Sequence, residues 1–223
     1  ITFLIVAATA WLAAGLERPR WSRNISIGGF VLVWLTAVYV RPPSPQPNHP
    51  LAVRLVQANS EDDQSLLQLS NPDGKPHPDV ILWPEYSYVS DVTRQPAVMK
   101  QLRSITQTTG SVLIFGAKQE AGSDQFRNTA YVLNPAGEII GRHVKNHTVP
   151  FIKDGIAGTV ALPISTPLGQ LGIAICFDCD FPDVTRRLAS NGAEVLLIPN
   201  DDPPEWGQVQ RSQHRRMFQM RAV

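Results

Sequence analysis

Cysteine is scarce in this chain, because only Cys176 and Cys179 occur among its 223 residues. Two cysteines are too few for a disulfide framework, so chemistry or packing has to explain them. An excess of one charge is also absent, since 20 basic and 19 acidic side chains leave a formal net charge of +1. With no basic stretch interleaved with aromatic residues, nothing suggests a nucleic-acid partner. No internal repeat is present, and the length allows one ordinary domain plus a small appendage.

Two apolar segments dominate the beginning of the chain. Residues 1–16 and 25–40 contain no charged side chain. Each is slightly shorter than the roughly 20 residues that a membrane-spanning helix needs. Trp11, Trp34 and Tyr39 would suit the membrane interface. We expect two transmembrane helices; a signal peptide is the alternative for the first segment and a buried globular helix for the second.

The loop between these segments carries three arginines, Arg18, Arg20 and Arg23. Positively charged loops stay in the cytoplasm, which would send the chain after residue 40 to the outer face of the membrane. Residues 41–50 contain five prolines and predict a stiff, extended linker. We therefore expect a membrane anchor over 1–40 and an exported domain over 51–223.

Strand-like and helix-like patterns alternate from residue 51 onward. The chain opens with Ile1 and stops within a helical pattern at Val223, so we expect a fragment cut at both ends. Alternating strands and helices with inserted hairpins are typical of a mixed α/β sandwich. The apolar runs and their periodicity predict strands at 51–59, 80–83, 111–117, 128–133, 139–144 and 195–198, a hairpin over 163–175 turning at 168–169, and helices at 97–109, 184–190 and 208–223.

Cys176 lies on a predicted turn between a buried strand and a helix. The apolar residues 173–175 suit the strand, and Pro182 and Asp183 suit the first turn of the helix. Helix N–H dipoles near such a turn favour the thiolate, which is the nucleophilic form of cysteine. A buried structural cysteine is the alternative interpretation.

Two further strand ends carry complementary chemistry. Glu85 follows the apolar run 81–84, and Lys145 follows the predicted strand 139–144. A cysteine that attacks an acyl carbon needs a base for its proton and a cation for the developing oxyanion. Most glutamates and lysines are solvent-exposed, which is the alternative for both. Together with Cys176, they predict a catalytic unit.

A metal site and a redox-active cysteine pair are the two alternatives to this catalytic unit. His143 and His147 lie close to Lys145, but no carboxylate or cysteine stands beside them at a ligand-like spacing, so we predict no metal site. The Cys176-x-x-Cys179 pair between a strand and a helix also fits a thiol–disulfide oxidoreductase. That alternative leaves Glu85 and Lys145 without a role.

The three motifs, in this order, resemble those of the nitrilase (carbon–nitrogen hydrolase) superfamily over about residues 51–223. The resemblance implies a four-layer αββα sandwich and a catalytic triad of Glu85, Lys145 and Cys176 that uses no cofactor. It also suggests a second group of residues that contact the substrate or the oxyanion: Tyr86, Phe177, Asp178 and Trp206.

Within the superfamily, the chain is most similar to bacterial apolipoprotein N-acyltransferases. The segment 145–151, Lys-Asn-His-Thr-Val-Pro-Phe, and the pairs Asn200-Asp201 and Gln213-His214 carry this likeness. The resemblance implies a thioester on the cysteine, formed from a phospholipid and passed to the N-terminal amine of a lipoprotein. It further implies a bacterial inner membrane, with the catalytic domain on its outer face.

One departure from that family's pattern keeps other functions open. Lys153 stands where the family has a second glutamate, and Asp154 would take that place only if the loop shifts by one residue. An anchored amidase acting on a small amide is therefore one alternative. A pseudoenzyme or binding module is another.

Overall fold

The computed structural model describes residues 2–16, 19–39, 50–58, 63–71 and 75–222. The chain divides into two compact units, Ile1–Pro50 and Leu51–Val223. Each unit is described by itself.

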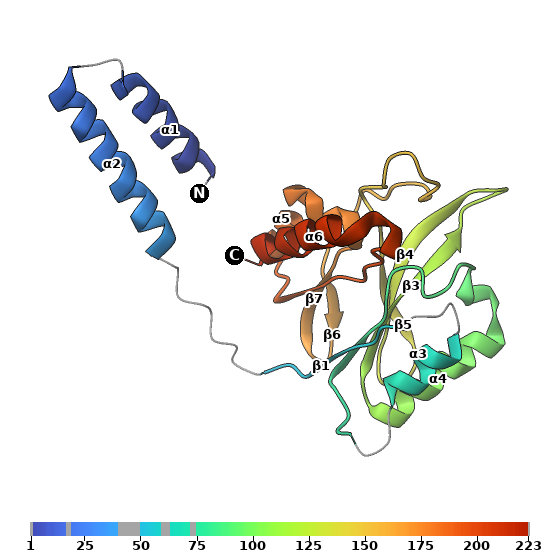
Figure 1. The fold of residues 1–223 in the computed structure, drawn as a ribbon. Helices are drawn as coiled ribbons and strands as arrows, with labels where there is room; N and C mark the ends of the chain where they lie inside the picture. The colour runs from blue at the N-terminus through green and yellow to red at the C-terminus, as the bar shows by residue number, and fades with distance from the viewer. Residues whose placement is uncertain (1, 17–18, 40–49, 59–62, 72–74, 223) are drawn as a thin grey trace. The chain divides into compact units, whose positions relative to one another are not determined.

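The first unit is a pair of helices that lie side by side, α1 (Thr2–Leu16) and α2 (Arg20–Tyr39) (Figure 1). They meet closely at Gly29, where an added Cβ would lie 2.2 Å from the Trp11 ring. Helix α2 begins earlier than the sequence predicts, so Arg20 and Arg23 belong to it and not to a loop; Arg18 lies outside the described residues. Among the helices described, none is both long and apolar enough to cross a membrane, and the two predicted transmembrane helices are not confirmed.

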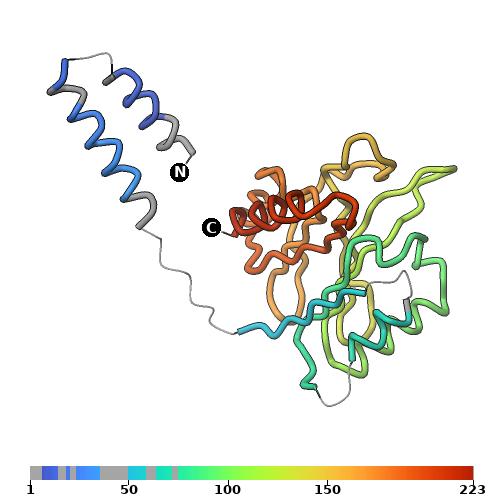
Figure 2. The backbone as a smooth tube through the Cα atoms, viewed as in Figure 1, coloured from blue at the N-terminus to red at the C-terminus, as the bar shows by residue number. Residues whose placement is uncertain are grey.

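The second unit contains a mixed sheet in the order β1-β2-β3-β4-β5. Strands β1, β2 and β3 run parallel, whereas β4 and β5 continue the sheet antiparallel. Figure 2 follows the chain through the β3–β4 hairpin, which extends beyond the rest of the sheet. The bounds are β1 (Val53–Leu55), β2 (Val80–Leu82), β3 (Val112–Glu120), β4 (Phe126–Leu133) and β5 (Ile139–Val144).

A smaller sheet has the order β6-β7-β8, with an antiparallel β6–β7 hairpin and a parallel β7–β8 pair. Its strands are β6 (Ile164–Thr166), β7 (Gly169–Ile173) and β8 (Val195–Leu197). The helices of the unit are α3 (Asp63–Ser70), α4 (Pro96–Thr109), α5 (Pro182–Ser190) and α6 (Gly207–Arg221), with short 3-10 helices η1 (Val92–Arg94), η2 (Cys176–Asp180) and η3 (Pro204–Trp206).

Strand alternation distributes the apolar side chains over two faces of the larger sheet. On one face, Ile81 and Phe115 pack in one cluster with Leu102 of α4. On the other face, Ile114 packs in a second cluster with Ile173 of the smaller sheet. Helices α5 and α6 cover the far side of that smaller sheet through a third cluster (Figure 1). The layers are therefore αββα, and the predicted α/β sandwich is observed.

The end of β2 is fixed by a buried hydrogen-bond chain. The Trp83 indole N–H donates to Ser70 Oγ at 2.7 Å, and that hydroxyl donates to the Leu66 carbonyl at 2.7 Å. Trp83 also packs edge-on against Phe115, with ring centroids 6.4 Å apart. Helix α3, which the sequence pattern did not predict, thereby anchors the segment that leads to Glu85.

Replacing Ser70 with alanine should destabilise this domain, because the buried Trp83 N–H would lose its acceptor. An unsatisfied buried donor costs about 1–3 kcal/mol, which lowers Tm by about 2–12 °C in a protein of this size. Thermal unfolding followed by circular dichroism measures the shift. Ser104→Ala, at an exposed position of α4, is the matched control. Equal melting of both variants would contradict the anchoring role of Ser70.

Candidate active site

Cys176 opens η2, directly after the apolar end of β7. Its backbone is left-handed, with φ of 43°, and its N–H donates to the Pro199 carbonyl at 3.0 Å. A non-glycine residue in this region is strained, and such strain persists only where the surrounding structure holds it. The turn thus fixes the thiol at the end of the smaller sheet, with only 2% of the residue exposed.

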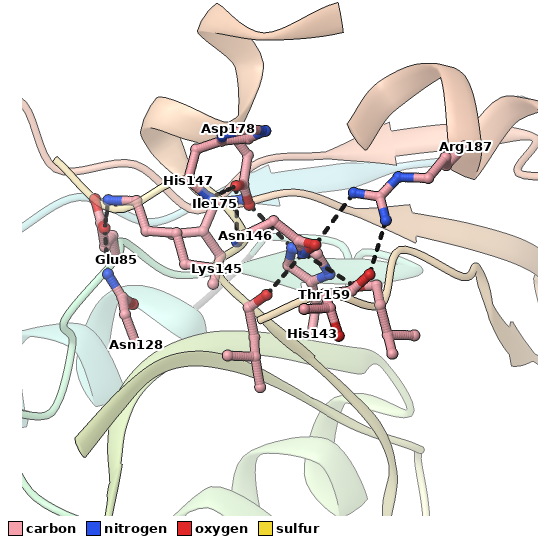
Figure 3. A network of polar contacts seen from close by, with 12 residues as sticks. Glu85, Asn128, His143, Lys145, Asn146, His147, Thr159, Ile175, Asp178 and Arg187 are labelled. Carbon is pink, nitrogen blue, oxygen red and sulfur yellow. Dashed lines mark hydrogen bonds and ion pairs between the residues drawn. The ribbon is translucent and has the colours of Figure 1, made fainter. Parts of the chain in front are cut away.

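Lys145 directly follows β5 and carries a buried ammonium group with two carboxylate partners. Its Nζ lies 2.8 Å from Glu85 Oε1 and 2.8 Å from Asp154 Oδ2. Asn128 of β4 joins both acids, donating from Nδ2 to Glu85 at 2.6 Å and to Asp154 at 2.9 Å. Figure 3 shows Lys145 and Asn128 converging on Glu85. Since Lys145 is 1% and Glu85 5% exposed, each charge depends on these partners.

Asp154 reaches this cluster because the preceding loop turns sharply. Phe151 is left-handed with φ of 69°, and the Asp154 N–H donates to the Ile152 carbonyl at 3.1 Å. The turn directs Asp154 inward while Lys153 stays exposed. Tyr86 donates to Asp154 Oδ1 at 2.6 Å, which fixes the carboxylate further. The charge reversal that Lys153 suggests in the sequence is therefore not present inside the cluster.

Burial and charge set the proton affinities of the cluster. Burial raises the pKa of Glu85 above its usual 4.5, although Lys145 and Asn128 act in the opposite direction. Burial also raises the pKa of the Cys176 thiol, and the nearby Glu85 charge and a hydrogen bond to Glu85 add to that rise. For Lys145 the two neighbouring acids outweigh burial, so its pKa is raised and it stays an ammonium ion. The resting cluster pairs a neutral thiol with a carboxylate of increased basicity.

Asp178 ties the segment after Lys145 to the turn that carries Cys176 (Figure 3). It is fully buried. Its Oδ1 accepts the N–H groups of Asn146 at 2.9 Å and of His147 at 2.8 Å, and its Oδ2 accepts the Ile175 N–H at 3.0 Å. His143 Nε2 lies 2.9 Å from the same Oδ2. Because protein groups surround both oxygens, we propose a positioning role for Asp178 in place of the expected substrate contact.

Tyr86, Phe177 and Trp206, the other residues expected to contact the substrate, lie in three different environments. Tyr86 lies in the cluster, bonded to Asp154 as described. Phe177 is half-buried, with its ring edge-on to Phe181 at 5.2 Å between centroids. Trp206 ends η3 at the surface and is 37% exposed. Two surface hollows, of about 500 and 530 Å³, lie elsewhere and are lined by none of the three predicted catalytic residues.

Cys179 packs apart from Cys176. It lies in the apolar cluster beneath α5 with Val184 and Leu188, whereas Cys176 belongs to the cluster between the sheets. Both thiols are free, and burial raises the pKa of Cys179 to about 12. A neutral thiol enclosed by aliphatic side chains is typical of a structural cysteine.

Sequence reasoning gave no role to three residues that the structure brings to the site. Asn128 bridges the two acids, and Asp202 and His214 lie within 4.8 Å of the Cys176 sulfur and of each other. Asp202 and His214 fall beside or within the pairs Asn200-Asp201 and Gln213-His214 that carry the family likeness, which was the only signal in the sequence for these two residues. The histidines weighed as a metal pair are bonded separately, His143 to Asp178 and His147 to Asp183.

An αββα sandwich that brings an acid, an ammonium group and a thiol to its strand ends has the architecture of the nitrilase class. A family model for carbon-nitrogen hydrolases matches residues 41–223, and the chain belongs to that family.

Curated relatives include both hydrolases and acyltransferases. The chain is 30% identical to the deaminated glutathione amidase of Mus musculus, over 46% of this chain and 37% of that protein. It is 27% identical to the apolipoprotein N-acyltransferase of Brucella suis, over 79% of this chain and 41% of that protein. The chain thus spans less than half the length of these two relatives.

Solved structures share the fold. A carbon-nitrogen hydrolase from Helicobacter pylori superposes with a TM-score of 0.63 at 21% identity, covering 78% of this chain and 70% of that one. An amidase from Nesterenkonia sp. superposes with a TM-score of 0.56 at 24% identity, covering 78% and 74%. The predicted nitrilase-like fold is confirmed.

Replacing Asp154 with asparagine should slow any reaction that depends on Lys145, because the ammonium loses one of its two carboxylate partners. A hydrogen bond to a charged group is worth about 1.5–3 kcal/mol, or about 10- to 100-fold in rate. The measurement is single-turnover acylation by an activated ester, read by intact-protein mass spectrometry. Lys153→Gln is the control and should stay within about twofold of the parent. A folded Asp154→Asn variant that acylates at the parent rate would remove Asp154 from the site.

Proposed function

We propose that this chain is the catalytic domain of a cysteine-dependent N-acyltransferase of the apolipoprotein type. In this proposal Cys176 is the nucleophile, Glu85 is the general base, and Lys145 stabilises the oxyanion. The observation that carries the proposal is the buried cluster in which Glu85 pairs with Lys145 at 2.8 Å and lies close enough to Cys176 to raise the pKa of the thiol.

The first half-reaction forms a thioester. Glu85 takes the thiol proton as the Cys176 sulfur attacks an ester carbonyl of a phospholipid, and the negative charge moves to the carbonyl oxygen beside Lys145. When the C–O bond breaks, the leaving lysophospholipid oxygen receives the proton held by Glu85. The acyl chain remains on the sulfur.

The second half-reaction transfers the acyl chain to the N-terminal amine of a lipoprotein. The neutral amine attacks the thioester carbonyl, and Glu85 accepts the proton that the nitrogen loses. The C–S bond then breaks, and Glu85 returns the proton to the leaving sulfur. The products are an amide and the original thiol, with no cofactor consumed.

Apolar side chains exposed beside the cluster support a lipid donor. Phe151 and Ile152 are exposed on the loop that leads to Asp154. Solvent-exposed apolar groups near a reactive site suit an acyl chain better than a small polar amide. The N-acyltransferase relatives also align over a larger share of this chain than the mouse amidase does.

A second candidate function is amide hydrolysis, which the mouse amidase relative and the Nesterenkonia amidase fold favour. The two candidates share the acyl-enzyme and differ in what resolves it, an amine or water. The acyltransferase proposal includes a location at the bacterial inner membrane, with the domain on its outer face. The acyl donor and the lipoprotein acceptor belong to it as well.

Cys176→Ala should abolish acyl-enzyme formation, whereas Cys179→Ser should retain most of it, because only the first thiol reaches Glu85. The chain is incubated with a fluorescent phospholipid, and the labelled thioester is measured by gel and by mass. A lipopeptide with a free N-terminal amine should then discharge the thioester faster than water does. Equal loss from both variants, together with a Cys176–Cys179 disulfide, would instead favour the oxidoreductase.

The acid limb of acylation should lie at a higher pH than a free glutamate would give. Glu85 has to be ionised to accept the thiol proton, and its pKa is raised, so the rate falls as pH drops through a value above the usual 4.5. Glu85→Gln should cost at least about a hundredfold and remove this limb. The pH–rate profile is measured where circular dichroism shows intact fold. Glu120→Gln, at an exposed site, is the control. An acid limb at or below pH 4.5 would contradict the role of Glu85.

A further inference from the structure

A second group of side chains converges on the Cys176 sulfur. Ligating atoms of Cys176, Asp202 and His214 all lie within 4.8 Å of one another. They come from three elements: η2, the segment between β8 and η3, and α6. Cys176 and His214 are buried, and Asp202 is half-buried. The proposed acyl transfer assigns no role to Asp202 or His214.

These three side chains are the donor types that zinc prefers. Zinc binds thiolate sulfur at about 2.3 Å and imidazole nitrogen and carboxylate oxygen at about 2.0–2.2 Å, in a tetrahedron that leaves a fourth position for water. Donors in such a tetrahedron lie about 3.5 Å apart. An ion would therefore have to enter between His214 Nδ1 and Asp202 Oδ1, which are now 2.8 Å apart, and widen that pair, while the Cys176 sulfur stays within 4.8 Å of both residues.

Both ring nitrogens of His214 face a carboxylate oxygen. Its Nδ1 lies 2.8 Å from Asp202 Oδ1, and its Nε2 lies 3.7 Å from Asp180 Oδ1. Both Nε2 and that Asp180 oxygen are buried and lack a hydrogen-bond partner in the described part of the chain. A ligand histidine commonly donates its other N–H to a carboxylate, which fixes the tautomer. Asp180 stands where that partner is needed if Nδ1 binds an ion.

The surroundings of the group are fixed and acidic. Arg221 at the end of α6 donates to the carbonyls of Cys179 and Asp180 at 2.9 Å each, which holds the helix against η2. Burial, together with the neighbouring charges of Asp202 and Glu205, raises the pKa of Asp201. Lys145, the cation of the neighbouring cluster, is already paired with two acids.

We propose that Cys176, Asp202 and His214 form a zinc site that holds the enzyme inactive while the ion is bound. The binding step replaces the thiol proton: Zn²⁺ and the Cys176 thiol give a Zn–S bond and one proton released to buffer, with no change of oxidation state. Bonding to zinc withdraws electron density from the sulfur, which makes it a weaker nucleophile toward the acyl carbon than the free thiolate. The site departs from the sequence-based expectation of no metal, because its members are separated by 26 and 12 residues.

Cobalt binding tests the site without any acyl substrate. The reduced full chain is titrated with Co²⁺, and thiolate coordination is read from its charge-transfer absorption; Zn²⁺ affinity is measured by displacing the cobalt. We expect one ion per chain. The signal should disappear in Cys176→Ala, and affinity should fall at least about tenfold in His214→Ala. Cys179→Ser and His147→Ala, which change a thiol and an imidazole outside the group, should bind as the parent does.

Asp202→Asn provides a second ligand variant that conserves side-chain size, in case His214→Ala does not fold. It should also weaken Co²⁺ binding at least about tenfold. The proposal is overturned if the folded parent shows no thiolate–cobalt band, or if the band persists unchanged in folded Asp202→Asn or His214→Ala. Because this readout needs no acylation, it can succeed or fail independently of the proposed acyl transfer. Inhibition of acylation by Zn²⁺ and its reversal by EDTA then test the regulatory part.

Discussion

The buried ammonium group of Lys145 is the interaction on which the rest of the site depends. Moving an isolated charge out of water costs several kcal/mol even in a relaxed protein. Two carboxylates at 2.8 Å offset that cost, and Asn128 links both of them from the adjacent strand. Removing either acid would leave a buried cation undercompensated, so the end of β2, the end of β5 and the Asp154 loop are held together by one charge.

A second buried carboxylate connects this cluster to the turn that carries Cys176. Asp178 accepts backbone N–H groups from both sides of the contact, at Ile175 and at Asn146. These hydrogen bonds fix the position of the left-handed turn at Cys176 relative to the segment that follows Lys145. The two sheets therefore meet through apolar packing in their interior and through Asp178 at the edge where Lys145 and Cys176 lie. The fold supplies the layers, and these few polar contacts determine how the strand ends are placed.

The sequence was sufficient for features that local chemistry determines. Apolar runs located most strands, and Gly110, left-handed with φ of 67°, ends α4 as the pattern predicts. The sequence was insufficient to predict which side chains the folded chain brings together at the site. The resemblance aligned Lys153 with an acidic position of the family, whereas the structure leaves Lys153 exposed and places Asp154, after the left-handed turn at Phe151, 2.8 Å from Lys145. Asp202 and His214 lie on separate elements, and no spacing rule links them to Cys176.

The presence of two acids around one ammonium has a consequence for the proposed reaction. At rest Glu85, Asp154 and Lys145 sum to one negative charge, so ionising the thiol as well would place two uncompensated charges in a buried site. When Glu85 takes the thiol proton during attack, its charge disappears and an equal charge forms on the oxyanion. The total charge of the cluster is then the same before and after attack. Lys145 exchanges Glu85 for the oxyanion as its partner, while Asp154 holds the ammonium in place. A single acid could not serve both as the base and as the fixed partner of the cation, which gives a physical reason for the second one.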